Sequence, residues 1–272
     1  MKNVNKKFWS LFLSMLILIG IAACDPDSED ADESGYLGNF LIIESQQVWS
    51  PNYETGKLSN ICKIFNDDRD VEVCVLMPQY DDNGENIIDA RGNNVIIKEV
   101  IDSGSIKNGI LNFEVNELGD NFLLKTGEDL LFYVFREWWV DDNKDGKAET
   151  ISISPEAARG NIITILTDSA SPEGLIKEGF SGSKTSLCAE YIYFVYVDRN
   201  CTITAEQGQD AIGYTTFNGF SINLKKGWNA ICKKETYRTT GYANISIEIK
   251  YPDDFRWILL PAPSITTSIT SP

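Results

Sequence analysis

Histidine is absent from this sequence of 272 residues. Imidazole is the usual general base of Ser-His-Asp and Cys-His nucleophile systems, and it ligates most catalytic zinc ions. The absence excludes these kinds of active site. Any catalysis by this chain would depend on Asp, Glu, Tyr, Lys or Cys side chains.

Basic residues are also scarce, since 24 Lys and Arg stand against 40 Asp and Glu, for a net charge of −16. Lys and Arg are the residues that bind nucleic-acid phosphates and anionic lipid headgroups. The composition therefore argues against nucleic acid as a partner and against docking on anionic headgroups. An acidic surface suits solubility and can attract divalent cations or cationic ligands.

The six cysteines contain no Cys-x-x-Cys pair. That spacing is typical of zinc knuckles and of thioredoxin-like redox sites, so its absence argues against both. Structural disulfides are the more ordinary role for such cysteines in an exported protein.

The N-terminal stretch has a basic start, an apolar segment at 8–21 and small residues before Cys24. The apolar segment is shorter than the ~20 residues that span a bilayer comfortably, which favours a signal peptide. The motif Ile21-Ala22-Ala23-Cys24 resembles the lipobox of bacterial lipoproteins. That resemblance implies removal of residues 1–23 and attachment of a diacylglycerol, with palmitate-type chains, to Cys24. An uncleaved membrane helix and a plain secretory signal are the alternatives.

Residues 24–36 are acidic and nearly free of apolar side chains, which predicts a disordered tether. Acidic residues directly after a lipidated cysteine resemble the export signals of surface lipoproteins in Bacteroidetes and some spirochaetes. In proteobacteria, Asp25 would instead resemble an inner-membrane retention signal, and a plain spacer is a third interpretation. We expect a protein anchored by its lipid to the cell envelope, at the outer membrane or surface of a Gram-negative-type bacterium.

From residue 37 onward, short apolar stretches alternate with turn residues, which is typical of β-structure. We expect an all-β, antiparallel, sandwich-like fold of one large or two consecutive units. The units would cover residues 37–170 and 171–262, followed by a flexible tail at 263–272. The expected strands are 61–65, 71–76, 94–101, 109–115, 130–140, 191–197, 201–204, 220–224, 228–232, 243–249 and 255–260. The strand at 191–197 is apolar on both faces, so we expect it to be central.

Two disulfides are predicted. A hairpin centred on Asp68 would place Cys62 opposite Cys74, within bonding reach. Cys201 with Cys232 is a second, weaker pairing. Five cysteines remain beyond the lipidated one, so at least one thiol is free or paired between chains. In this scheme that thiol is Cys188.

A loop after the aromatic stretch matches part of an EF-hand-like calcium site. The matching residues are Asp141, Asn143, Asp145, Lys147 through its carbonyl, and Glu149. Ser152 stands where a bidentate Glu is expected, and the flanking segments read as strands. The loop is therefore either a Ca²⁺ site on a β-hairpin or a polar turn.

Trp138 and Trp139 are candidates for binding a sugar ring by stacking. Glu137, Asp141 and Asp142 lie beside them and could form a glycosidase pair. Adjacent side chains on a strand point to opposite faces, so only one of the two Trp residues can face a ligand. Carboxylates at this spacing also commonly flank a solvated turn.

Three segments carry a resemblance to β-rich surface lipoproteins of Treponema and Bacteroidetes: residues 196–203, 222–229 and 255–257. That resemblance implies a β-rich fold and no particular reaction. We expect an envelope protein that binds a glycan, a host molecule or another envelope protein. The alternative is a carbohydrate-active enzyme that uses paired Asp and Glu.

Overall fold

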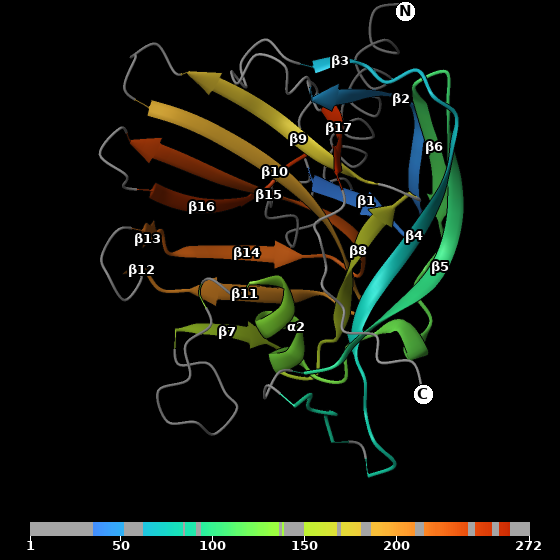
Figure 1. The fold of residues 1–272 in the computed structure, drawn as a ribbon. Helices are drawn as coiled ribbons and strands as arrows, with labels where there is room; N and C mark the ends of the chain where they lie inside the picture. The colour runs from blue at the N-terminus through green and yellow to red at the C-terminus, as the bar shows by residue number, and fades with distance from the viewer. Residues whose placement is uncertain are drawn as a thin grey trace, which may run out of the picture. The chain divides into compact units, whose positions relative to one another are not determined.

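A computed structural model of the protein describes residues 35–51, 62–83, 85–90, 94–135, 138, 150–167, 170–180, 186–209, 215–238, 243–251 and 256–261. These residues form mostly β-strands, with one α-helix and a short 3-10 helix (Asp120–Phe122) among them (Figure 1). The α-helix is α2 (Gly127–Val134). The strands are β1 (Tyr36–Gly38), β2 (Leu41–Pro51), β3 (Cys62–Ile64), β4 (Arg69–Pro78), β5 (Ile96–Lys107), β6 (Ile110–Val115), β7 (Ile151–Ser154), β8 (Gly160–Leu166), β9 (Ala170–Phe180), β10 (Ser186–Val197), β11 (Cys201–Ala205), β12 (Gly208–Gln209), β13 (Thr215–Phe217), β14 (Phe220–Leu224), β15 (Gly227–Arg238), β16 (Ala243–Ile249) and β17 (Arg256–Pro261).

The strands form a large sheet and a small sheet, so the expected all-β fold class is confirmed. The large sheet has the order β12-β13-β16-β15-β10-β8-β4-β5-β6-β2-β17-β9, with β1 on β15 and β3 on β2. Its pairings are antiparallel except for β13 with β16 and β17 with β2. The small sheet has the order β14-β11-β7 and is antiparallel.

The large sheet closes on itself at β10. One edge of β10 pairs with β15 along its whole length. Its other edge pairs with β8 near Val197 and with β9 near Leu187. The path from β10 through β8, β4, β5, β6, β2, β17 and β9 therefore returns to β10. The strand expected at 191–197 is indeed central.

Strand alternation on β10 divides the buried side chains between two cores. Ile192, Phe194 and Tyr196 point to one side, and Val195 and Val197 point to the other. The first core lies within the closed path of strands and extends onto the neighbouring strand β15. Its larger members are Leu41, Val73, Ile106, Leu111, Phe113, Ile165, Phe194, Tyr196, Trp228 and Trp257.

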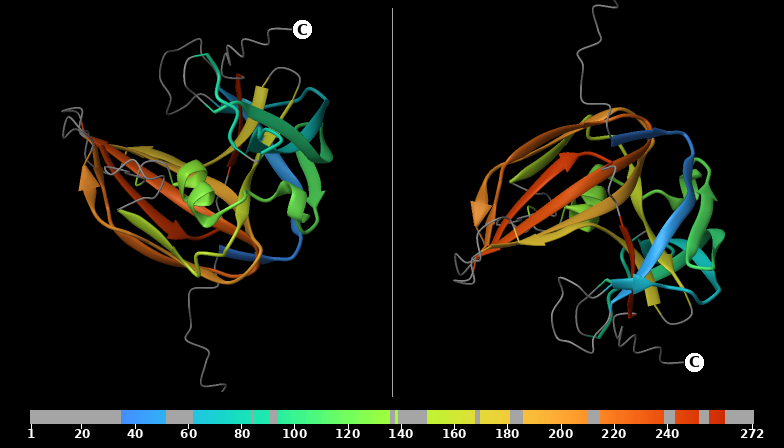
Figure 2. Two further views of the ribbon diagram at one scale, coloured as in Figure 1. Left: turned by 90° about the horizontal axis from the view of Figure 1, so that it is seen from below. Right: turned by 90° about the horizontal axis from the view of Figure 1, so that it is seen from above.

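The second core lies between β10, β15 and β16 on one side and the small sheet with α2 on the other. Figures 1 and 2 show α2 beside the small sheet. The larger members of this core are Leu130, Leu131, Phe135, Trp138, Ile153, Val195, Ile203, Ile222, Leu224, Ile231 and Ile245. The described members of each core all belong to the compact unit Ser34–Pro272. The packing that the structure describes is therefore internal to this unit.

The two expected β units share one sheet. Strand β2, from residues 37–170, pairs with β17, from residues 171–262. Strands β8 and β10 likewise pair across that division. The described strands of the two stretches are thus interleaved within a single compact unit.

The expected strand at 130–140 is wrong where the structure describes it, because helix α2 covers Gly127–Val134. Buried residues recur at Gly127, Leu130 and Leu131, which is helical spacing. A capping box formed by Thr126 and Asp129 starts the helix. The aromatic content of the segment favours a strand, but the cap and the apolar spacing favour a helix.

The expected hairpin around Asp68 is also wrong. Both strands exist, but β3 pairs with β2, and β4 pairs with β5 and β8. Beyond β4, an antiparallel bridge joins Tyr80 and Asn86.

Candidate functional site

A partly open pocket lies between the end of α2 and the strands β8, β10, β15 and β16. Its volume is about 460 Å³, which falls in the range of ~300–1,000 Å³ that is usual for small-molecule sites. Its lining residues are Tyr133, Val134, Phe135, Ile162, Tyr193, Ile231, Lys233 and Ile247. Among the described residues, the walls are therefore mostly aliphatic and aromatic, and Lys233 is charged.

Strand alternation determines which side chains of the sheet reach the pocket. Ile231 and Lys233 are two residues apart on β15 and share one face, while Cys232 between them belongs to the first core. Tyr193 on β10 lies opposite Ile231, and Ile247 on β16 lies opposite Lys233. Three neighbouring strands thus form a continuous wall.

Helix α2 contributes another wall. The hydroxyl of Thr126 accepts a hydrogen bond from the Asp129 amide at 3.1 Å, and the Asp129 carboxylate accepts one from the Thr126 amide at 3.0 Å. Leu130 and Leu131 are fully buried and fix the helix on the second core. The residues at its end, 133–135, are then held at the pocket.

Lys233 is neutralised by a neighbour on its own strand. Its Nζ lies 3.0 Å from Oε1 of Glu235, and only 11% and 12% of the two side chains are exposed. Burying one charge alone is costly, but opposite charges in contact compensate each other. The pocket lining therefore includes a residue whose ammonium group is in contact with a carboxylate.

The hydroxyl of Tyr133 is a second polar group at the pocket. It accepts a hydrogen bond from Nδ2 of Asn94 at 2.8 Å. Burial raises the pKa of Tyr133; the bond from Asn94 opposes the rise and the Asp129 charge adds to it. The hydroxyl consequently keeps its proton at neutral pH.

The structure rules out Trp138 as a stacking platform. Its side chain is only 2% exposed and belongs to the second core. Its Nε1 donates a hydrogen bond to the carbonyl of Asn218 at 2.9 Å, and its ring packs against Phe217 and Phe220. Trp138 is thus a structural anchor, because both its ring and its polar atom are engaged inside the protein. Trp139 lies outside the described residues.

The candidate calcium ligands Asp141, Asn143, Asp145, Lys147 and Glu149 all lie outside the described residues. The same is true of the carboxylates Glu137 and Asp142. In the part of the chain that the structure describes, no three His, Cys, Asp or Glu side chains are grouped as metal ligands. The calcium interpretation stays a prediction from the sequence.

Both predicted disulfides are corrected, because Cys74 and Cys201 are free, buried thiols. Cys62 and Cys74 are on strands that do not pair with each other. Cys201 belongs to the second core and Cys232 to the first. Burial raises the pKa of Cys74, and burial together with the Asp198 charge raises that of Cys201 to about 12.

Cys24 and the rest of the segment that resembles a lipoprotein signal also lie outside the described residues. Among the helices that the structure does describe, none has the length and apolar character to cross a membrane.

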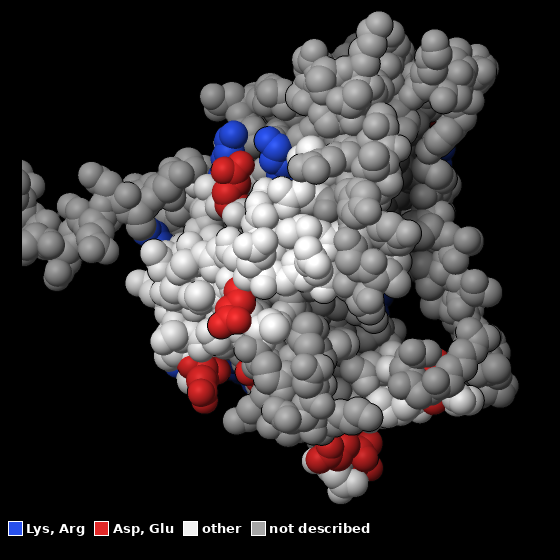
Figure 3. Space-filling model, turned by 90° about the vertical axis from the view of Figure 1, so that its left-hand side faces the viewer, with Lys and Arg blue, Asp and Glu red and all other residues white. Residues whose placement is uncertain are grey.

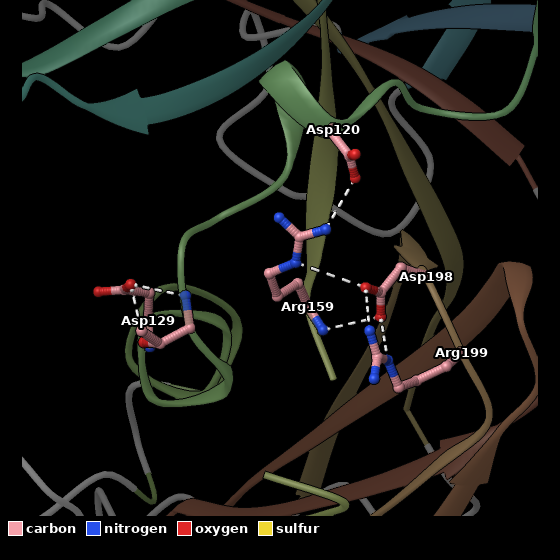
Figure 4. A network of polar contacts seen from close by, with 6 residues as sticks. Asp120, Asp129, Arg159, Asp198 and Arg199 are labelled. Atoms are coloured by element: carbon pink, nitrogen blue, oxygen red, sulfur yellow. Dashed lines mark hydrogen bonds and ion pairs between the residues drawn. The ribbon is translucent and has the colours of Figure 1, made fainter. Parts of the chain in front are cut away.

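A polar network joins the start of β8 to the end of β10 (Figure 4). The Asp198 carboxylate accepts hydrogen bonds from the Arg159 amide at 2.9 Å and from the Arg199 guanidinium at 3.0 and 3.1 Å. The Arg159 side chain lies 3.4 Å from Asp198 and 2.7 Å from Asp120. Burial raises the pKa of Asp198, but the two arginines outweigh burial and lower it. The network fixes the start of β8 and the end of β10. Its residues are not among those that line the pocket.

Two further turns explain why residues 196–203 and 222–229 look like fold motifs. The side-chain oxygen of Asn200 accepts a hydrogen bond from the Lys226 amide at 2.8 Å. The side chain of Asn229 bonds the backbone of Lys225 and the carbonyl of Gly227. These residues hold the β14–β15 turn against the β10–β11 turn, so their role is structural.

The acidic side chains do not gather in one place on the face seen in Figure 3. Among the described residues on that face, acidic groups lie apart from one another, basic groups lie near one of them, and uncharged residues fill the middle. This part of the surface therefore gives no indication of a cation-binding patch.

The pocket residues were not found from the sequence. One signal was present: Lys233 and Glu235 both fall on the inward face of a strand whose other inward residue is Ile231. Opposite charges on the same face of a strand as a buried residue suggest a buried ion pair. The contribution of α2 was hidden by its assignment as a strand.

The fold and the pocket together define an all-β protein with a largely apolar, partly open pocket at the side of its second core. No family model matches this chain, and neither a characterised protein nor a solved structure is similar to it.

Proposed function

We propose that this chain is a lipid-anchored binding protein of the bacterial cell envelope, which binds a small molecule in the pocket between α2 and β15. The observation that carries the binding role is the pocket itself, with a volume of about 460 Å³ and walls to which mostly apolar residues contribute. Pockets of this size, with few polar groups, are usual for small ligands. The anchor rests on the sequence around Cys24.

The location would be the outer membrane or the cell surface of a Gram-negative-type bacterium. Several acyl chains on one cysteine would hold the protein durably, since each buried CH₂ contributes about 0.8 kcal/mol. The acidic residues 25–33 would then separate the membrane surface from the folded unit, which begins at Ser34 and includes Tyr36 in β1.

Metabolic labelling with palmitate tests the anchor. In a bacterial host, the full chain should incorporate the label and sediment with membranes, and Cys24→Ser should do neither. An equal yield of unlabelled, membrane-bound protein from the wild type and Cys24→Ser would reject the lipid anchor and favour an uncleaved membrane helix.

Direct binding tests the pocket. The unit Ser34–Pro272 would be dialysed to equilibrium against 2-acetonaphthone, a small aromatic ketone. Ile247 lines the pocket and its side chain is half-buried, so Ile247→Trp should fill the space and reduce binding at least about tenfold. Ile88→Trp, at an exposed position, is the matched control. No binding, or binding that both variants retain in full, would refute the proposed function.

A further inference from the structure

The connection between β4 and β5 has backbone pairings of its own. We call its described residues the strap: 79–83, 85–90 and 94–95. Within the strap, the amide of Ile87 donates to the carbonyl of Gln79 at 2.8 Å, and the amide of Val95 donates to the carbonyl of Ile87 at 2.8 Å. So small a set of β pairings is only marginally stable alone. The strap therefore depends on its contacts with the rest of the protein.

The strap contacts the chain at both ends of α2. Before the start of the helix, the Lys125 ammonium lies 3.3 Å from the centroid of the Tyr80 ring, and a cation is attracted to an aromatic face in this position. Near the end of the helix, Nδ2 of Asn94 donates a hydrogen bond to the hydroxyl of Tyr133 at 2.8 Å. Tyr133 also lines the pocket, so the strap holds a residue of the pocket wall.

Two polar atoms of the strap are buried without a partner. They are the hydroxyl oxygen of Tyr80 and Oδ1 of Asn86, and neither has a hydrogen bond in the part of the chain that the structure describes. The two residues are partners in an antiparallel bridge, so both unpaired atoms belong to one small region. Buried polar groups in native proteins are nearly all paired, and each unpaired one costs free energy that contact with water would recover.

The surroundings of the Tyr80 hydroxyl keep its proton in place. Burial raises the pKa of Tyr80, and the charges of Asp129 and Tyr133 raise it further. Both of these residues belong to α2, so the unpaired hydroxyl lies near the helix. A protonated hydroxyl has a donor and an acceptor to satisfy, and the strap as it lies on α2 satisfies neither. The contact between strap and helix thus contains a built-in weakness.

We propose that the strap opens and closes over α2 and thereby controls the pocket wall at Tyr133. In the closed state, which this structure shows, Asn94 holds the hydroxyl of Tyr133. Opening admits water to Tyr80 and Asn86, which offsets the loss of contacts with α2. This device rests on the binding function proposed above, because the wall that it controls belongs to that pocket. A ligand that packs on Tyr133 binds the closed state and keeps the strap closed.

Two hydroxyl deletions test the strap without any ligand, by amide hydrogen exchange on the full chain. Tyr80→Phe removes the unpaired hydroxyl and keeps an aromatic ring beside Lys125. Exchange of the Ile87 and Val95 amides, which are hydrogen-bonded within the strap, should become about tenfold slower. Tyr133→Phe is the matched change at a hydroxyl that has a partner. It should make the same two amides exchange about fivefold faster.

The probe 2-acetonaphthone tests the connection between strap and pocket. A ligand that binds only the closed state reduces opening by the factor 1 + [L]/Kd. At a free probe concentration of about nine times its Kd, the Ile87 and Val95 amides should therefore exchange about tenfold more slowly. In the control Ile247→Trp, whose new side chain should fill the pocket, the probe should leave the exchange of these amides unchanged.

The outcomes separate the strap from the pocket. Unchanged or faster exchange in Tyr80→Phe would overturn the strap, because the hydroxyl would then be satisfied in solution. Probe binding that Ile247→Trp abolishes, but that leaves strap exchange unchanged, would keep the pocket and overturn its connection to the strap. Failure of the probe to bind would reject the proposed function and this connection, whereas opposite effects of Tyr80→Phe and Tyr133→Phe would still support a strap that opens.

Discussion

The two cores of this protein share a sheet but are closed in different ways. The first core is enclosed by strands that pair in a continuous path back to β10. The second core has the other face of β10, β15 and β16 on one side, and on its other side a three-stranded sheet and an eight-residue helix. The candidate pocket lies at the edge of the second core.

The difference shows how a pocket can arise without a gap in the hydrogen-bonded sheet. Paired strands lie about 4.7–4.9 Å apart, so a closed path of strands brings the inward side chains together. A short helix covers a sheet less evenly, and the space beyond the end of α2 is where Phe135, Tyr193 and Lys233 meet. The first core thus provides a rigid support, and the second core provides the site.

Tryptophan truncation compares the packing of the two cores and should give the largest effects. Trp228 is fully buried in the first core, where its ring packs on Tyr196 and its Nε1 donates to the Asn116 carbonyl. Trp228→Ala should cost about 5 kcal/mol of unfolding free energy, at the upper end for such changes, and Trp138→Ala about 3 kcal/mol. Urea denaturation followed by circular dichroism measures both.

The smaller loss is expected for Trp138 because its partners Phe217 and Phe220 are only half-buried. They can move to fill part of the space, which reduces the cost of a cavity. A larger loss for Trp138→Ala than for Trp228→Ala would contradict the comparison, since it would make the second core the more tightly packed one.

A glycine substitution tests the start of β15, which both cores share. Gly227 has φ of +109°, and a Cβ there would lie 2.5 Å from the backbone oxygen of Gly38. Gly227→Ala should lower the unfolding free energy by about 2 kcal/mol because of backbone strain and this contact. Gly208→Ala meets nothing within 4 Å and is the matched control. Equal stability of the two variants would show that the β14–β15 turn is less constrained than its geometry indicates.

Removal of the helix cap affects only the second core. Thr126→Ala should cost about 1 kcal/mol, and hydrogen exchange should accelerate in α2 but not in β4 or β5, since these strands belong to the first core. Thr126→Ser keeps the hydroxyl and should restore most of the loss. Faster exchange in β4 and β5 would mean that the cores open together.

The sequence was most informative where the chain alternates between buried and exposed residues. Alternation predicted the strands that became β6, β11, β14, β16 and β17 close to their observed bounds, and it predicted β5, β10 and β15 as strands five or six residues too short at one end. The two-sided apolar pattern at 191–197 predicted the central strand. Pairing partners were harder to predict. The loop near Asp68 looks like a hairpin, yet β4 pairs with β5 and β8, because long-range packing decides which strands meet.

The candidate site was not predictable in the same way. The aromatic stretch that contains Phe135 and Trp138 suggested a strand and a sugar platform, whereas these side chains are buried in the second core, at and just after the end of α2. The pocket depends on where the end of α2 stops relative to Tyr193 and Lys233. Such a distance is set by tertiary packing, which local patterns in the sequence do not encode.

The smallest expected effect concerns Asp198, which connects β8 and β10 where the two cores meet. The arginines lower its pKa in the folded protein despite burial, so its stabilising contribution exists above the ordinary carboxyl pKa of about 3.9. The contribution is lost as the pH falls from there through the lowered pKa of the folded state. Asp198→Asn should therefore cost on the order of 1 kcal/mol at pH 7, and the difference from the wild type should shrink below pH ~4.

Urea denaturation at both pH values measures this difference in unfolding free energy. Asp120→Asn is the control, because Asp120 binds the same Arg159 from an exposed position. A difference that stays constant or grows in acid would mean that the Asp198 network does not hold the two cores together through its charge.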